Sequence, residues 1–260
     1  MLKVWQYSIY DLARNRWTYS YFIIFLVMAV ALLQMSASMN MAVASLLNII
    51  IILVPLISTV FGAIYFYHSR EFLELLLSQP IKRRSLFLGH YLGMATSLSL
   101  SLVAGLGIPF LFYGLWESGQ SGAFLNLMLV GVFLTYTFSG LAYLIAITND
   151  NRVKGFGLAI FVWLLLAVLY DGVFMLCLVM FEDYPLEKFS LFATILNPID
   201  LSRIIIMLKL DVAALLGYTG AVFNKFLGTG QGYIIALSVL LLWTIWPVLL
   251  YLRIAGKKDF

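Results

Sequence analysis

Long apolar runs, separated by short polar segments, dominate the chain. Residues 17–69 contain no Asp, Glu, Lys or Arg, and neither do residues 85–116. A membrane-spanning helix needs about 20 mostly apolar residues. At about 1.5 Å per residue, the first run is too long for one crossing, so it must fold back once, at the polar stretch 34–40. The pattern therefore predicts six spans, near residues 18–34, 43–67, 86–113, 123–147, 155–181 and 233–252.

The composition supports a membrane protein and excludes most soluble classes. Hydrophobic residues make up 63% of the chain and charged residues only 11%, whereas a soluble domain is roughly half apolar and a quarter charged. The basic residues are scattered at the ends of apolar runs, without the clustered face that nucleic-acid binding needs. We therefore predict an all-α polytopic membrane protein in which residues 1–260 form a single transmembrane domain.

The distribution of basic residues predicts the orientation in the membrane. Six spans place both termini on one side, and twelve of the 16 Lys and Arg residues fall on that side. The other four are Lys188, Arg203, Lys209 and Lys225. Because basic residues are enriched in cytoplasmic loops, both termini are predicted to be cytoplasmic.

One dense group of charges interrupts the apolar pattern between the second and third predicted spans. It contains Arg70, Glu71, Glu74, Lys82, Arg83 and Arg84. A charge at the centre of a spanning helix costs about 3 kcal/mol, so this segment cannot cross the membrane. Residues 70–78 contain no Gly or Pro, which predicts a short helix that Pro80 ends.

Two interpretations of this short helix remain open. A helix lying on the membrane surface usually carries Lys or Arg on its polar face. The polar face here carries Glu71 and Glu74, which anionic lipid would repel, so a protein partner is favoured. A second amphipathic segment, residues 1–16, has an apolar stripe of Trp5, Ile9 and Leu12 and is predicted to lie on membrane lipid.

These features together resemble the permease subunits of the ABC-2 type of ABC transporters. The matching stretch is LLLSQPIKRRSLFLGHYLG, with leucines at 75–77, Pro80, the pair Arg83 and Arg84, and Gly89 at the start of the third span. The resemblance implies that residues 68–85 form a coupling helix that fits a groove on a separate cytoplasmic ATPase. The implied coupling residues are Arg70, Glu71, Glu74, Leu75, Leu76, Leu77, Pro80, Arg83 and Arg84.

Three short stretches resemble a subgroup of that family, the Nos-type permeases of nitrous-oxide reductase maturation. They are SQPIKRRSLFLG, LYDG at 169–172 and NPIDLSR at 197–203. The resemblance implies a homodimer in the bacterial inner membrane with two ATPase copies, which bind ATP and Mg. It also implies a periplasmic β-helical partner, and copper or sulfur species as cargo. The chain has no G-x-x-x-x-G-K-[ST] loop, so we expect it to bind no ATP and no other cofactor itself.

The outer half of the chain offers two further candidate sites. Asp171 is the only formal charge inside a predicted span; intramembrane acids are costly and often functional, and a structural role is equally open. The segment 182–232 is predicted to form short helices at the outer face, with Asp200 capping a helix from Leu201. Four of its residues are candidates for docking an outer partner, although a lid over the dimer is also open: Asn197, Pro198, Asp200 and Arg203.

A metal site is not predicted. Met35, Met39 and Met41 cluster in the first outer turn and thioethers suit Cu(I), but methionines are common in membrane chains, so these are weak candidates. His68 and His90 flank the charged segment without carboxylates at ligand spacing.

Three other functions are alternatives to that of a Nos-type permease. The first is an ABC-2 exporter of lipid, drug, peptide or polysaccharide, and the second is a mechanotransmission protein that moves no substrate. Few polar residues face any plausible pore, which favours the second over the first. The third, an intramembrane enzyme, would need paired acids or an H-E-x-x-H motif within the spans, and both are missing.

Overall fold

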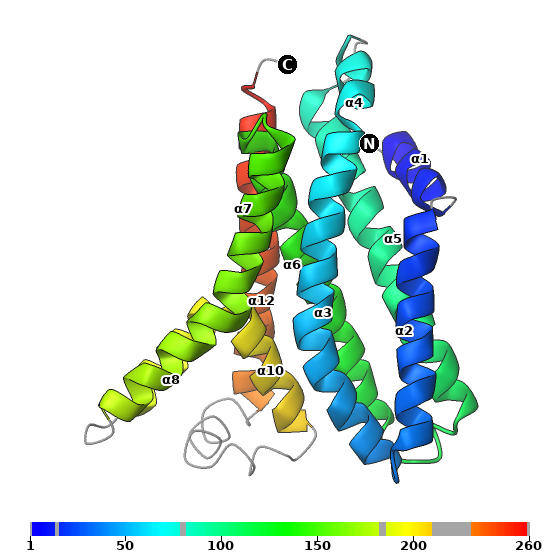
Figure 1. Ribbon diagram of the computed structural model, residues 1–260, viewed down its shortest axis with the longest axis vertical. Coiled ribbons are helices and arrows are strands. Elements are labelled where there is room, and N and C mark those ends of the chain that lie inside the picture. The colour runs from blue at the N-terminus through cyan, green and yellow to red at the C-terminus, as the bar shows by residue number, and fades with distance from the viewer. Residues whose placement is uncertain (1, 14–15, 79–81, 182–185, 210–229, 259–260) are drawn as a thin grey trace.

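The computed structural model describes residues 2–13, 16–78, 82–181, 186–209 and 230–258. Within these ranges the chain is helical and contains no strand, which confirms the predicted all-α class. Six long helical segments cross the molecule side by side (Figure 1).

The six predicted spans are confirmed, and each is a few residues longer than the apolar pattern indicated. They are α2 (Arg16–Met35), α3 (Met39–His68), α5 (Arg83–Phe112), α6 (Ser121–Thr148), the composite span of α7 (Arg152–Leu164), η1 (Leu165–Leu169) and α8 (Tyr170–Met180), and α12 (Gly230–Ala255). The predicted turn between the first two spans ends at Ser38, whose hydroxyl accepts a hydrogen bond from the Met41 backbone N–H and caps α3.

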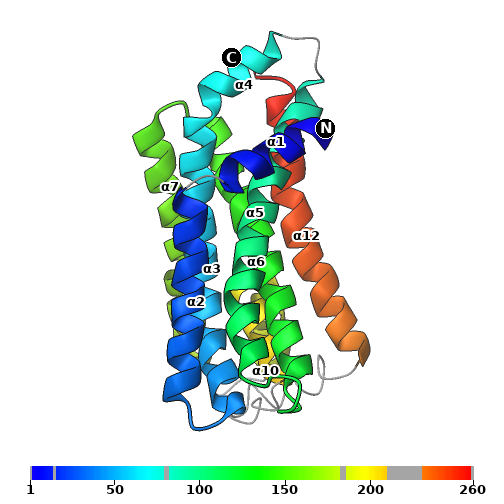
Figure 2. The same ribbon diagram turned by 90° about the vertical axis from the view of Figure 1, so that its right-hand side faces the viewer.

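Helix α6 lies at the centre of the bundle, packed against α3, α5, α10 and α12 (Figure 2). Small residues allow α3 and α6 to pack closely against each other. A Cβ added at Gly62 of α3 would lie 2.8 Å from the Ala142 Cβ of α6. In the half nearest α4, aromatic rings fill the core, with Tyr143 centred 5.5 Å from both Phe66 and Tyr251.

His90 lies inside this aromatic core. Its ring stacks on Tyr65 with centroids 4.6 Å apart, and its Nδ1 is 3.1 Å from the Tyr143 hydroxyl. The sequence had suggested a position beside the charged segment. Because His90 is two helical turns into α5, it points into the bundle instead.

Both chain termini lie at the same end of the molecule as the short helix α4 (Arg70–Leu77), as an even number of crossings requires (Figure 1). At that end α1 (Leu2–Ala13) lies across α5 (Figure 2). Its Leu12 and Ser8 are buried, and Ser8 packs against Gly93 of α5. The helical prediction for this segment is confirmed, but its apolar stripe packs partly on protein rather than wholly on lipid, because Gly93 has no side chain to hold α1 away.

The segment predicted to lie at the outer face contains a sharply bent helix pair, α9 (Glu187–Leu196) and α10 (Pro198–Lys209), which we call the outer hairpin. The two helices are bent by 114° around Asn197. Ile199, Leu201 and Ile205 are fully buried, so α10 enters the bundle beside α6 and α12. The predicted short helices are confirmed for this part of 182–232, whereas residues 182–185 and 210–229 lie outside the described residues.

Candidate functional site

Helix α4 has one face against the bundle and one face open. Leu73 is 2% exposed, whereas Leu75 is 70% exposed, and Phe72 stacks on Tyr7 of α1 with centroids 5.3 Å apart. Leu76 and Leu77 are partly buried. The predicted short helix is confirmed, but its leucines are divided between an inner and an outer face. The stop predicted at Pro80 lies outside the described residues.

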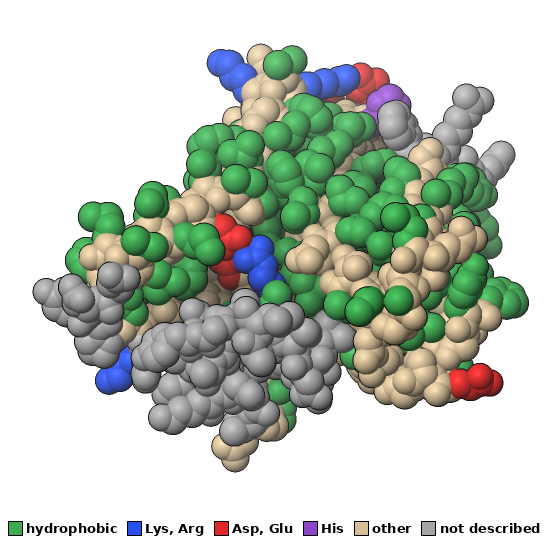
Figure 3. Space-filling view, turned by 60° about the horizontal axis from the view of Figure 1, so that its bottom comes forward, with side chains coloured by type: hydrophobic (Ala, Val, Ile, Leu, Met, Phe, Trp, Pro, Cys, Tyr) green, Lys and Arg blue, Asp and Glu red, His purple; other side chains and the backbone are tan. Residues whose placement is uncertain are grey.

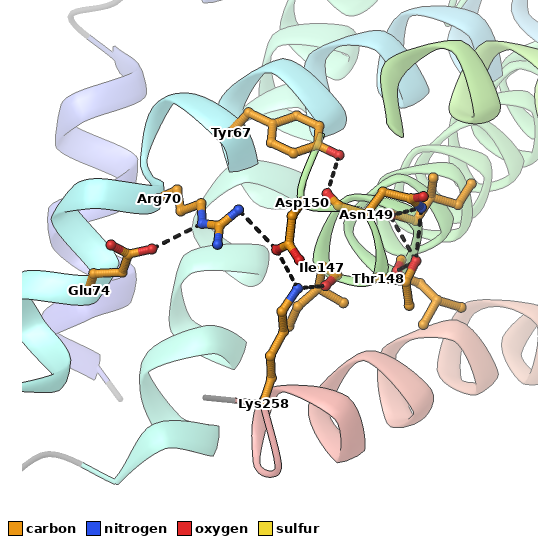
Figure 4. Close-up of polar contacts among 10 residues, drawn as sticks. Tyr67, Arg70, Glu74, Ile147, Thr148, Asn149, Asp150 and Lys258 are labelled. Carbon is orange, nitrogen blue, oxygen red and sulfur yellow. Dashed lines mark hydrogen bonds and ion pairs between the residues drawn. The ribbon is translucent and has the colours of Figure 1, made fainter. Parts of the chain in front are cut away.

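The N-terminal end of α4 is fixed by a group of polar contacts that we call the Asp150 cluster: Tyr67, Arg70, Glu74, Asp150 and Lys258 (Figure 4). Arg70 Nε lies 3.0 Å from the Glu74 carboxylate, and Arg70 Nη1 lies 3.1 Å from Asp150. Lys258 Nζ lies 2.8 Å from the same Asp150 oxygen. The Tyr67 hydroxyl donates to the Asn149 carbonyl at 2.8 Å.

The Asp150 cluster joins three parts of the chain that are far apart in sequence: the junction of α3 and α4, the loop between α6 and α7, and the end of α12. The hydrogen bond from Lys258, its positive charge and that of Arg70 hold the pKa of the Asp150 carboxyl below its usual range. The Asp150 carboxylate is therefore ionised at neutral pH. Because the Asp150 side chain is largely exposed, these ion pairs add little stability, and their main consequence is to set the position of α4 relative to α7.

The basic pair after α4 also contacts the end of α12. Arg83 Nη1 donates to the Lys258 carbonyl at 3.1 Å. Arg84 lines a groove together with Trp246, Leu249 and Arg253. The resemblance had implied that both arginines take part in ATPase coupling, and that role stays a prediction.

Asn197 is the residue that locks the outer hairpin to the fifth span. It is fully buried, its Nδ2 donates to the Leu166 carbonyl at 2.8 Å and to Asp200 Oδ2 at 2.9 Å, and its Oδ1 accepts from Ile199 N–H at 3.0 Å. Leu166 belongs to η1, a π-helical turn, and such turns often occur at functional sites. The predicted helix cap was wrong: Asn197 caps α10, whose first residue is Pro198, and Asp200 lies in the first turn of the helix.

Asp171 is paired across the same interface. Its Oδ2 lies 2.8 Å from Arg203 Nη1, which also lies 3.5 Å from Asp200. The Tyr170 hydroxyl adds a bond to the Ala193 carbonyl at 2.6 Å. Figure 3 shows acidic and basic groups adjoining in one hollow of a mostly apolar surface. The structure thus brings the predicted intramembrane acid and the predicted docking residues into one cluster.

The predicted roles of these outer residues are not settled by their positions. Asn197, Pro198 and Asp200 are buried within the hairpin, so contact of this segment with an outer partner stays a prediction. Met35 and Met41 are exposed, and a copper role for the methionines also stays a prediction. No group of three or more His, Cys, Asp or Glu side chains suited to a metal ion occurs among the described residues.

Comparison with known proteins gives two relatives that cover most of the chain, although no protein-family profile matches it. Both carry the name probable ABC transporter permease protein NosY. The protein from Stutzerimonas stutzeri is 28% identical over 79% of this chain and 81% of its own length. The protein from Pseudomonas aeruginosa is 28% identical over 81% of this chain and 84% of its own length. The chain is thus a multi-pass membrane protein that resembles ABC transporter permeases of the NosY type.

Proposed function

We propose that the chain is the membrane subunit of an ATP-driven complex in which α4 receives movement from a separate cytoplasmic ATPase. The observation that carries this proposal is the division of α4 into a fixed and an open face. Leu73 and the Asp150 cluster attach α4 to the bundle, while Leu75 is 70% exposed. The Glu71 side chain is 86% exposed and lies 3.7 Å from Arg152 at the start of α7. A short rigid element of this kind can transmit a push to the spans on either side of it.

Within that role, the function we propose is maturation of the copper–sulfur centre of nitrous-oxide reductase. The resemblance to NosY and the stretches SQPIKRRSLFLG, LYDG and NPIDLSR support it. The complex would be a homodimer in the inner membrane with two ATPase copies. The fifth span supports a dimer, because only 6% of its apolar stretch is buried in the single chain. A β-helical periplasmic protein would bind the outer face.

A second candidate, transmission of movement without transport of a substrate, is supported by the contacts along the fifth span. At one end, Asp150 joins α4 to the loop before α7. Near the other end, Leu166 and Asp171 are bonded to Asn197 and Arg203 of the outer hairpin. Displacement of α4 would therefore reach the hairpin through a bonded path. The charges at the far end of that path, Asp171 and Arg203, are partly exposed and paired with one another.

Purification of the tagged full chain, expressed with its neighbouring gene products, tests the proposal. We expect an ATPase to elute with it in equal amounts, together with a periplasmic protein, and a deletion strain to produce nitrous-oxide reductase without its copper–sulfur centre. If only an ATPase elutes with the chain, and the deletion strain still makes nitrous-oxide reductase with its copper–sulfur centre, the proposed maturation role is wrong. The proposed permease role would still stand. Elution without any nucleotide-hydrolysing protein would remove both.

A further inference from the structure

A groove of about 520 Å³ lies between the start of α5 and the last turns of α12, at the end of the bundle that carries α4 (Figure 2). Its volume is in the range of roughly 300–1,000 Å³ typical of small-molecule sites. The lining has a charged part, Arg84 from α5 and Arg253 from α12, and an apolar part on α12 that includes Trp246 and Leu249. This combination of cations beside an apolar wall suits a ligand that is itself amphipathic.

The two arginines of the groove have no acidic partner within the chain. Neither guanidinium forms an ion pair with any residue that the structure describes. By contrast, Arg70, Arg152 and Arg203 lie 3.0, 3.7 and 2.8 Å from a carboxylate oxygen. Both groove arginines are exposed, so their guanidinium groups can reach an anion that enters the groove.

The two arginines also lie near each other. A Cβ added at Gly256 would lie 3.6 Å from Arg84 Nε and 3.6 Å from the Arg253 carbonyl oxygen, so the Arg84 side chain lies beside the turn that carries Arg253. The helix dipole favours a basic residue such as Arg253 in the last turn of α12. It disfavours Arg84 in the first turn of α5, and that turn contains no acid. An anion bound between the two guanidinium groups would offset both their mutual repulsion and this unfavourable position.

The apolar part of the groove indicates that the anion carries a hydrocarbon chain. Trp246 and Leu249 are 54% and 56% exposed, and only 17% of the apolar stretch of α12 is buried. Trp246 lies seven residues before Arg253, which is about 10 Å along the helix toward the middle of the span. A second copy of the chain is a poorer occupant, because a symmetric contact uses the same surface on both copies and would bring four arginines into one interface.

We propose that this groove binds one anionic phospholipid from the leaflet on the α4 side of the membrane. The guanidinium groups of Arg84 and Arg253 donate hydrogen bonds to its phosphate oxygens, and an acyl chain lies along Trp246 and Leu249. A zwitterionic lipid binds less well, because its head group brings an ammonium charge next to the two arginines. The site does not depend on the proposed contact between α4 and an ATPase, so either one can hold without the other.

Titration of the purified full chain with two phospholipids tests this site. Native mass spectrometry of the chain in detergent measures the binding of the first molecule of phosphatidylglycerol, or of phosphatidylcholine with the same acyl chains. Each arginine beside an anionic head group contributes about fivefold in affinity, so we expect the wild-type protein to prefer phosphatidylglycerol by about 25-fold. The combined Arg84→Gln and Arg253→Gln variant should bind the two lipids equally, with an unchanged melting temperature because both side chains are exposed.

A control with the same change in charge shows whether the preference belongs to the groove. Arg152→Gln combined with Lys154→Gln removes two positive charges from the same end of the molecule, outside the groove, and should keep the 25-fold preference. Equal binding of the two lipids by the wild-type protein would overturn the proposal, as would an equal loss of preference in the control variant. Displacement of the lipid by inorganic phosphate would show a site for a soluble anion instead. A change from dimer to monomer in the groove variant would show that a second copy covers the groove, and would also overturn the proposal.

Discussion

The Leu75→Asp variant is expected to lose its ATPase partner while keeping its fold. Leu75 is 70% exposed on the open face of α4 and takes no part in the core, so the stability of the chain should change by less than about 0.5 kcal/mol. An apolar anchor at the centre of an interface typically contributes about 2 kcal/mol or more, and the new carboxylate would add to the acidic face formed by Glu71. We expect the affinity for the ATPase to fall at least about 30-fold, as measured by titration of the purified subunits.

The matched control is Trp116→Asp, the same kind of change at the opposite end of the molecule. Trp116 is 66% exposed in the loop after α5, on the side away from α4. This variant should bind the ATPase like the wild-type protein. If Leu75→Asp binds as tightly as Trp116→Asp, then α4 is not the contact.

The Asn197→Leu variant is expected to loosen the outer hairpin from the fifth span. The substitution leaves the Leu166 carbonyl and the Ile199 N–H without their partners in a buried site. An unsatisfied buried polar group costs about 1–3 kcal/mol, so the free energy of unfolding should fall by about 3 kcal/mol. For a chain of this size that corresponds to a melting temperature about 6–12 °C lower, measured in detergent micelles.

The same substitution at another asparagine provides the reference. Asn48 lies on an exposed face of α3, so Asn48→Leu should leave the melting temperature within a few degrees of the wild-type value. An Asn197→Leu protein as stable as Asn48→Leu would show that the bonds between η1 and the hairpin do not hold the outer half together.

The spans and the short helix α4 could be predicted from sequence because each depends on local composition. A run without charges must enter the membrane, and residues 70–78 combine four charges or hydroxyls with helix-forming leucines, which gives a short amphipathic helix. The cap of α10 could also have been predicted, because asparagine before proline is a common helix start. The sequence interpretation assigned the cap to Asp200 instead.

The contacts that connect these elements could not be predicted in the same way. Asp150 and Lys258 are 108 positions apart, and Asn197 is 31 positions from Leu166. Such pairs form only because the helices pack around α6, which brings distant loop residues to one end of the bundle. Leu73 and Leu75 look equivalent in sequence as well, and only the approach of α4 to the bundle makes one buried and the other exposed.

A light-activated cross-link from position 75 tests the contact between α4 and the ATPase most directly. A photo-reactive phenylalanine analogue replaces Leu75 in the full chain, the complex is irradiated in intact cells, and the cross-linked products are identified by mass spectrometry. The account predicts a covalent product with a nucleotide-hydrolysing cytoplasmic protein. Products with lipid alone, from cells that contain that ATPase, would contradict it.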